Sequence, residues 1–344
     1  MRSAQTAWRG VGAGLLVGLL FPATALGARQ LSVPLVDYVT EIRIFMPGDG
    51  SNGYVVPTSE ERAAFTAAAT ALVAKGDVAR AEQALAPYPW FEILDYRDGT
   101  GGAPYWVIAE KTPLARGWGF YFFARAASRD ALIIEAPHPL ADRDSELLAA
   151  RAASELRPAA FLLAGAHRYA DGGRASDMTH ATYSIFQSMH EVVTTASRVA
   201  VQIHGFSSAT HPGYPELLLS SGTTVPGPAA EQICTVVTDQ GLGCTLFTGT
   251  AFAPLGAQTN VQGAFSRQAA GDGHFLHFET ADTVRDEAPR GEIIIRALAD
   301  HWPAPVGSHG CAHAATGRAA LDWGWLIGYG VLWACRRWRP RRKA

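Results

Sequence analysis

From Asp130 to about residue 300, short hydrophobic runs alternate with longer segments in which apolar residues recur at helical spacing. A short, continuous apolar run is typical of a buried strand, and a period near 3.6 is typical of a helix. The predicted strands are 131–135, 160–164, 199–203, 275–279 and 293–295. The predicted helices are 145–156 and part of 178–197. This alternation predicts an α/β fold with a mixed, mostly parallel sheet flanked by helices.

The residues before Asp130 follow a different pattern, which predicts a smaller N-terminal α+β region. Segment 60–85 has helical spacing and is interrupted at 75–77, so it predicts two helices. Three apolar segments then predict strands, at 91–96, 105–110 and 118–123. We therefore expect an N-terminal region over 28–125 and a larger α/β domain over 126–305.

One long stretch inside the larger domain shows neither the apolar run of a strand nor the spacing of a helix. Residues 205–228 are rich in Ser, Gly, Thr and Pro. That composition predicts a long surface loop, placed where it can cover a site.

Composition narrows the class of protein. The chain has 344 residues, of which 48% are hydrophobic and 17% are charged, so it can bury a sizeable core. The formal net charge is −2, which does not provide the basic face that a nucleic-acid-binding protein needs. We expect no nucleic-acid partner.

The first 27 residues have the features of a secretory signal peptide. Arg2 and Arg9 give a positive start, residues 11–20 form a short apolar run, and small residues precede position 28. The run is too short to span a bilayer comfortably, which favours a cleaved signal over an anchor. We expect export to the periplasm or the cell surface.

The C-terminal tail, 306–344, carries a second signal. Residues 319–335 are apolar apart from Asp322, and an arginine-rich segment, 336–343, follows at once. This order predicts a transmembrane anchor with a cytoplasmic stop. Together with Gly310-Cys311 it also resembles the C-terminal sorting tails of myxobacterial surface proteins, which implies a tail that is cleaved or modified. A last core helix is the third alternative.

Two of the four cysteines, Cys234 and Cys244, lie in the body of the chain. In an exported protein this close spacing predicts a disulfide. A two-thiolate metal site is disfavoured because the spacing and neighbouring ligands are wrong for one.

The chemistry of the chain is concentrated where the predicted strands end. His138, His204 and Glu279 each follow or close an apolar strand, and Glu146 begins the next helix. Ligands of open α/β sheets bind beyond the carboxyl ends of the strands. Two histidines and one glutamate are a known ligand set of catalytic Zn²⁺. We expect His138, Glu146 and His204 to bind zinc, with Glu279 as the general base for a zinc-activated water.

Some of these positions have competitors. Asp142 and Asp144 lie close to Glu146 and offer the same ligand chemistry. Glu146 also suits a helix start, where the helix dipole favours a carboxylate. His277, two residues before Glu279, is the nearest rival for the role of base.

A second polar cluster runs from His167 to His190. Arg168 follows a predicted strand and can hold a substrate carboxylate, and His180 is expected to line the same pocket. Asp177, His180 and Ser184 have the spacing of one helix face. Asp177 and His167 are candidates for orienting a ligand histidine. Alternatively, Ser176 or Asp177 simply caps that helix.

The order of these residues resembles the metallocarboxypeptidase-like superfamily. That group includes zinc carboxypeptidases, N-formylglutamate amidohydrolases and zinc hydrolases of poly-γ-glutamate. Carboxypeptidases place the first histidine and the glutamate much closer together than His138 and Glu146, which seven residues separate. The resemblance covers about residues 130–300 and is nearer to the amidohydrolase and poly-γ-glutamate branches.

The sequence therefore predicts an exported zinc hydrolase of an amide bond, in a peptide, γ-glutamyl compound, N-acyl amino acid or cell-wall fragment, held at the membrane through its tail. The alternative is a non-catalytic, surface-displayed binding protein on a degenerate hydrolase fold. A serine hydrolase is disfavoured because the sequence has no Gly-x-Ser-x-Gly element.

Overall fold

A computed structural model describes residues 27–99 and 101–305. Its centre is one ten-stranded sheet with the strand order β1-β2-β3-β4-β6-β5-β7-β10-β8-β9. The four neighbouring strands β6, β5, β7 and β10 are parallel to one another, and antiparallel pairs flank this group on both sides. The predicted α/β class with a mixed, mostly parallel sheet is confirmed.

The N-terminal part supplies one side of the sheet, three α-helices and a short 3-10 helix. Its strands are β1 (Arg29–Val33), β2 (Phe91–Asp98), β3 (Pro104–Glu110) and β4 (Phe120–Ala124). Its helices are α1 (Leu35–Ile42), the short 3-10 helix η1 (Arg43–Phe45), α2 (Ser59–Lys75) and α3 (Val78–Leu85). Because β4 pairs with β6, this region and the larger predicted domain share one sheet. The boundary near residue 125 stays a prediction.

The remainder alternates strands with helices. The strands are β5 (Arg129–Ala136), β6 (Pro158–Leu163), β7 (Val199–Phe206), β8 (Leu217–Ser220), β9 (Cys244–Leu246) and β10 (Phe275–Ala281). The helices are α4 (Ser145–Leu156), α5 (Ile185–Val193), α6 (Pro228–Asp239), η2 (Ala253–Leu255), α7 (Val261–Ala270), α8 (Asp282–Asp286) and α9 (Ala288–His301).

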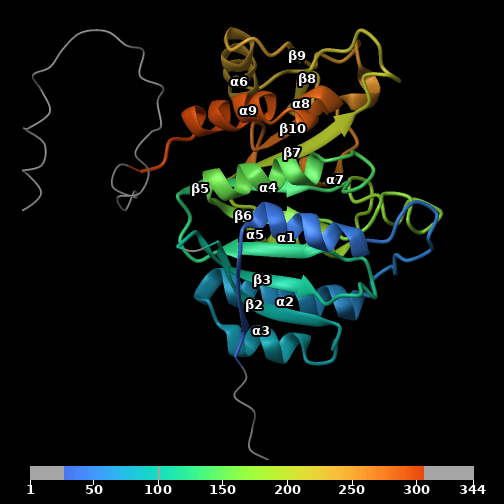
Figure 1. Ribbon diagram of the computed structural model, residues 1–344, viewed down its shortest axis with the longest axis vertical. Helices are drawn as coiled ribbons and strands as arrows, with labels where there is room; N and C mark the ends of the chain where they lie inside the picture. The colour runs from blue at the N-terminus through green and yellow to red at the C-terminus, as the bar shows by residue number, and fades with distance from the viewer. Residues whose placement is uncertain (1–26, 100, 306–344) are drawn as a thin grey trace, which may run out of the picture. The chain divides into compact units, whose positions relative to one another are not determined.

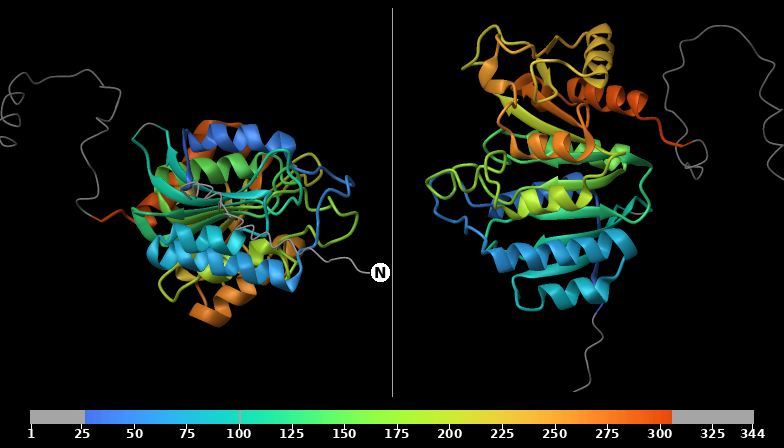
Figure 2. Two further views of the ribbon diagram at one scale, coloured as in Figure 1. Left: turned by 90° about the horizontal axis from the view of Figure 1, so that it is seen from below. Right: turned by 180° about the vertical axis from the view of Figure 1, so that it is seen from behind.

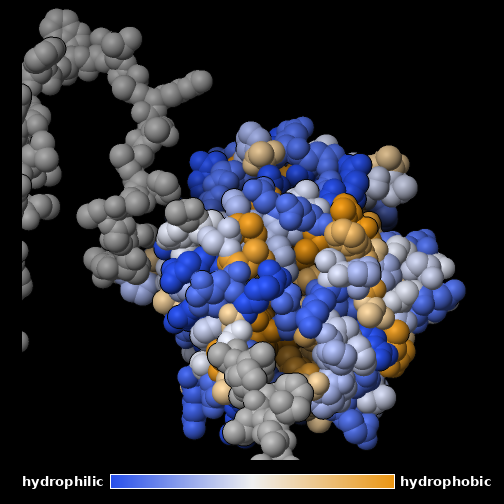
Figure 3. All heavy atoms as spheres, turned by 60° about the horizontal axis from the view of Figure 1, so that its bottom comes forward, coloured by the Kyte–Doolittle hydropathy of each residue, from blue (hydrophilic) through white to orange (hydrophobic). Residues whose placement is uncertain are grey.

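Helices cover both faces of the sheet (Figures 1 and 2). One apolar layer lies between the sheet and helices α1, α4, α6 and α9. The other lies between the sheet and helices α2, α3 and α5, and includes Ile133, Ala200 and Phe275 from three neighbouring strands. Seen from the β2–β3 end, polar residues cover most of the visible surface, with apolar side chains in small groups between them (Figure 3).

Local signals explain why segment 60–85 forms two helices. Thr58 accepts a hydrogen bond from the backbone of Glu61, whose side chain accepts one from the Thr58 backbone, so a capping box starts α2. Gly76 adopts a left-handed conformation and ends α2. Asp77 then caps α3 through the Arg80 amide. The predicted interruption at 75–77 is confirmed.

Three local predictions are wrong. Residues 293–295 lie in α9, because Ile294, Ile295 and Leu298 are buried at helical spacing. Ser184 caps α5 through the Gln187 amide, so residues 177–184 precede that helix and do not form one of its faces. Segment 205–228 is not all loop, since it contains β8.

The predicted disulfide is confirmed. Cys234 of α6 and Cys244 of β9 are bonded, with their Cα atoms 5.5 Å apart. A disulfide is compatible with an exported protein.

The prediction of a transmembrane segment is corrected. None of the helices in the described part of the chain combines the length and the apolar character that a membrane crossing requires. The predicted signal peptide and the C-terminal tail, with the apolar stretch 319–335, lie outside the described residues.

Candidate metal centre

Adjacent parallel strands bring the predicted residues to one edge of the sheet. His138 follows β5, His204 lies near the end of β7, and Glu279 lies near the end of β10. The β7–β10 register pairs Glu279 directly with His204 and places His277 beside Gln202. The predicted convergence of His138, His204 and Glu279 therefore follows from the strand order.

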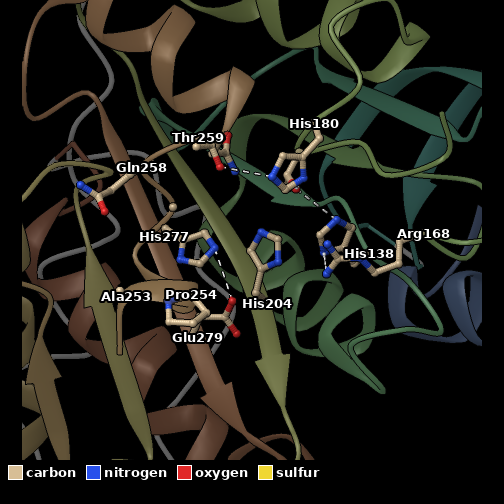
Figure 4. Close-up of a pocket in the computed structure, with 13 residues that line it drawn as sticks. His138, Arg168, His180, His204, Ala253, Pro254, Gln258, Thr259, His277 and Glu279 are labelled. Carbon is tan, nitrogen blue, oxygen red and sulfur yellow. Dashed lines mark hydrogen bonds and ion pairs between the residues drawn. The ribbon is translucent and has the colours of Figure 1, made fainter. Parts of the chain in front are cut away.

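These side chains line one cavity of about 230 Å³ together with Arg168, His180 and part of the segment 253–260 (Figure 4). The imidazoles of His138, His204 and His277 lie in a row, with ring centroids 4.8 and 4.3 Å apart. All three rings are almost fully buried. A row of buried imidazoles at a cavity wall is a strong concentration of potential metal ligands.

His138 is held between two carboxylates. Its Nε2 lies 2.8 Å from Oδ1 of Asp177, and its Nδ1 lies 3.2 Å from Oδ2 of Asp142. Asp142 comes back to His138 because residues 138–142 form a tight turn, in which the Asp142 amide donates to the His138 carbonyl. Leu140 and Asp144 have positive φ, which allows this turn before α4.

His204 has a parallel arrangement. Its Nδ1 lies 3.0 Å from the same Oδ2 of Asp142, and its Nε2 lies 3.2 Å from Oε1 of Gln202. Both histidines thus direct Nε2 at an oxygen that accepts hydrogen bonds. A neutral imidazole with its proton on Nε2 keeps a lone pair on Nδ1.

In those tautomers three atoms that accept hydrogen bonds lie close together, namely Nδ1 of His138, Nδ1 of His204 and Oδ2 of Asp142, and Nη1 of Arg168 is 3.5 Å from the first of them. His138, Asp142 and His204 form one group with ligand atoms within 4.8 Å of one another. Buried acceptors that face one another are costly unless a proton or a cation lies between them. Two imidazole nitrogens and a carboxylate oxygen are donors of the kind that zinc uses, so the residues fit a metal ion.

The electrostatics of the group are consistent with tight charge pairing. Burial disfavours the ionised form of Asp142, but contacts with His138 and His204 outweigh it and hold the pKa of this carboxyl well below its usual range. For His138, burial is outweighed by the two aspartates, and the pKa is raised. For His204, burial dominates and the pKa is lowered.

Glu146 is not brought to this group. Its Oε1 accepts a hydrogen bond from Arg43 at 2.8 Å, and its buried Oε2 has no hydrogen-bond partner among the described residues. Glu146 lies in the first turn of α4, which packs against α1, and Arg43 follows α1 directly. Asp144 contacts the same arginine at 2.6 Å. Of the three carboxylates considered from the sequence, Asp142 is the one beside the histidines.

Glu279 faces the cavity from β10 and is 8% exposed. Burial, with the charge of Asp142, raises its pKa well above the ordinary value. With His204 and His277 it forms a second group whose ligand atoms also lie within 4.8 Å. His277 Nε2 is 3.6 Å from Glu279 Oε1, and burial lowers the pKa of His277 well below its ordinary value. Strand alternation puts both side chains on one face, as predicted.

Asp177 connects the histidines to the predicted substrate-binding residues. Besides His138 it contacts Arg168 at 2.6 Å, Thr179 Oγ1 at 2.9 Å and His180 at 3.2 Å. Burial opposes its ionisation, but these contacts prevail and lower its pKa. Arg168 and His180 both line the cavity, on the His138 side (Figure 4).

His167 lies apart from this cluster. Its Nδ1 accepts a hydrogen bond from the Tyr169 amide at 3.2 Å, and its ring packs against Tyr169. Gln202, by contrast, was not considered from the sequence. A polar residue inside the apolar run 199–203, two positions before a candidate ligand, was the available signal, because alternate strand residues share a face.

Comparisons with known proteins give similarities of fold alone. No protein-family model matches the sequence, and no curated protein does. Among solved structures, a gene product from Agrobacterium tumefaciens is 11% identical with a TM-score of 0.37, covering 51% of this chain and 88% of that one. The zinc-free form of YNDL is 11% identical with a TM-score of 0.36, covering 51% and 86%. A candidate metallopeptidase from Shewanella amazonensis is 12% identical with a TM-score of 0.34, covering 62% and 87%.

Proposed function

We propose that this chain is an exported, zinc-dependent hydrolase of an amide bond, with His138, Asp142 and His204 as the zinc ligands. The observation that carries the proposal is the meeting of two imidazole nitrogens and a carboxylate oxygen in one buried group. Two histidines with one carboxylate leave an open coordination position, as catalytic zinc sites require.

Asp142 takes the ligand position for which the spacing of the sequence favoured Glu146. Its Oδ2 contacts both histidines, whereas the Glu146 carboxylate is engaged by Arg43. Burying an ionised carboxylate beside two imidazoles is favourable only when positive charge accompanies it. A divalent cation provides that charge.

Glu279 is the general base of the proposal. When bound, zinc supplies Lewis acidity that lowers the pKa of water in the site. Glu279 lies on the neighbouring strand, in register with His204, and its carboxylate faces the same cavity. Its buried position raises its pKa, which suits a group that must accept a proton and later release it to a leaving amine.

The substrate side of the cavity carries Arg168 and His180. Arg168 is held by Asp177 and lies against the cavity, where a guanidinium can pair with a carboxylate. We therefore propose a peptide, γ-glutamyl compound, N-acyl amino acid or cell-wall fragment as substrate. The disulfide supports export, together with the predicted signal peptide.

The test is the metal content and activity of the purified full chain. We expect one bound zinc per chain and hydrolysis of a compound in a panel of N-acyl amino acids and γ-glutamyl peptides. Chelation should abolish hydrolysis, and added zinc should restore it. His204→Ala should lose both metal and activity. His211→Ala, a histidine outside the cavity, is the matched control and should retain both. A parent chain that binds no divalent metal would contradict the proposal and favour the binding-protein alternative.

A further inference from the structure

A row of polar side chains continues from the metal centre into the interior of the protein. Glu135 of β5 pairs in register with Gln202 of β7, and both are fully buried. They lie on the same sheet face as the apolar residues Ile133 and Ala200. Burying a carboxylate and an amide in an apolar layer is costly unless their hydrogen bonds are made. The partners of these two side chains therefore decide how stable the buried row is.

All hydrogen-bonding positions of the Gln202 amide have partners. Its Nε2 donates to Glu135 Oε2 at 2.8 Å and to Gln262 Oε1 at 3.1 Å. Its Oε1 accepts from Asn260 Nδ2 at 2.7 Å and faces His204 Nε2 at 3.2 Å. The side chain thus joins the buried row to a proposed zinc ligand.

The donor side of this amide is fixed by its surroundings. Glu135 Oε1 lies 2.6 Å from His190 Nδ1, and its Oε2 lies 2.8 Å from Gln202 Nε2. The Nε2 of Gln262 is committed to the Met178 carbonyl at 2.9 Å, so its oxygen must face Gln202. A carbonyl oxygen only accepts hydrogen bonds, so the atom of Gln202 that faces Gln262 Oε1 is the amide nitrogen.

The acceptor side is fixed independently. The Oδ1 of Asn260 accepts from the Gly263 amide at 2.9 Å, so its Nδ2 must face Gln202. Turning the Gln202 amide over would oppose two NH₂ groups on one side and two oxygens on the other. Because buried hydrogen bonds that are left unmade are costly, Oε1 stays toward His204.

We propose that Gln202, oriented by Glu135 and Asn260, is a positioning residue that keeps the His204 proton on Nε2 and its Nδ1 lone pair toward the metal. The inference rests on the proposed function, because it concerns a ligand of that zinc. Supporting hydrogen bonds of this kind fix the tautomer and ring orientation of metal-bound histidines.

The first experiment measures zinc affinity of the full chain by competition with a chelator. Gln202→Met keeps the side-chain size but removes the acceptor, and should weaken zinc binding by about 10–100-fold. Glu135→Gln should weaken it as well, because the new amide places an NH₂ group against a donor.

Gln187→Met is the matched control. Gln187 is a buried glutamine of the same network, but its hydrogen bond is to Gln262, which in turn contacts Gln202 and not His204. It should lower thermal stability while leaving zinc affinity near that of the parent. Parental affinity in a folded Gln202→Met protein, or equal loss in Gln187→Met, would overturn the positioning role.

The second experiment uses no metal and no variant. Nitrogen-15 NMR of the metal-free parent should find the neutral His204 ring protonated on Nε2; a proton on Nδ1 would overturn the inference even if the chain proves to be a zinc hydrolase. A parent that binds no zinc fails the proposed function first and takes the inference with it. Zinc-dependent hydrolysis in the parent, together with parental zinc affinity in Gln202→Met, removes only the inference.

Discussion

At the scale of single residues, the centre depends on which carboxylate reaches two histidines. Asp142 does so because the turn after β5 reverses the chain within four residues of His138. Glu146, four residues later, lies in the first turn of α4, and that helix packs against α1. The difference comes from the direction of two side chains, and it is open to a direct comparison of two variants.

Asp142→Asn and Glu146→Gln should separate the two carboxylates. Asp142→Asn should weaken zinc binding by more than the roughly 10–100-fold that loss of a supporting hydrogen bond costs. Glu146→Gln should keep parental zinc affinity but weaken the contact with Arg43, at a cost of about 1–3 kcal/mol in unfolding free energy. Chelator competition and urea unfolding measure the two effects. The reverse pattern would restore Glu146 as the ligand.

Glu279→Gln tests the general base. The amide keeps the size of the side chain but cannot take a proton from water, so turnover should fall by about 10²–10⁴-fold. Zinc content should be unchanged, since Glu279 is not one of the three proposed ligands. Steady-state kinetics with parallel metal analysis provides both readouts. If Glu279→Gln works at the parental rate with zinc bound, His277 becomes the residue to test.

At the scale of elements, the local sequence pattern was sufficient to predict a helix or a strand wherever the spacing of apolar residues fitted one of them alone. Helix α4 begins and ends where the sequence predicted, because its apolar spacing is regular from Ser145 to Leu156. The run 293–295 misled because three successive isoleucines fit either a strand or a buried helix face. The prediction of a helix over residues 177–184 was wrong because side chains there form local hydrogen bonds that compete with helix formation. Thr179 donates to Asp177, and Ser184 caps α5, so the helix begins only after Ser184.

The disulfide joins two elements at the edge of the sheet and should stabilise them. Cys234 and Cys244 are ten positions apart, and closing a loop of that length restricts the unfolded chain by about 2–3 kcal/mol. The double substitution Cys234→Ser and Cys244→Ser should lower the unfolding free energy by that amount in urea. A reducing agent should destabilise the parent similarly and leave the double variant unaffected. Equal stability of parent and variant would contradict this.

At the scale of the whole molecule, the site could be predicted in outline and not in detail. Parallel strands carry their carboxyl-end residues to one edge, so His138, His204 and Glu279 could be grouped from sequence alone. The hydrogen bond that holds Glu146 comes from Arg43, which is 103 positions away. The position of His204 relative to β5 depends on the register between β5 and β7. Such pairings arise from tertiary packing, for which a single sequence gives no local signal.

The buried tyrosines of the sheet should make the whole molecule unstable to alkali. Burial raises the pKa of Tyr54, Tyr96, Tyr105 and Tyr121 above the ordinary value. Above pH about 10 the unfolded chain therefore loses protons that the folded chain keeps, so unfolding free energy falls as pH rises. Each such tyrosine should add a slope of up to about 1.4 kcal/mol per pH unit.

Tyr105→Phe isolates one contribution. The Tyr105 hydroxyl lies 3.5 Å from the Ala153 carbonyl, a long contact, so its removal should change stability little at pH 7. Between pH 10 and 11 the variant should lose stability less steeply than the parent, by up to about 1.4 kcal/mol per pH unit, because one group no longer ionises on unfolding. Urea unfolding at a series of pH values measures both slopes. Identical slopes in parent and variant would mean that Tyr105 already ionises in the folded protein, against its burial in the sheet.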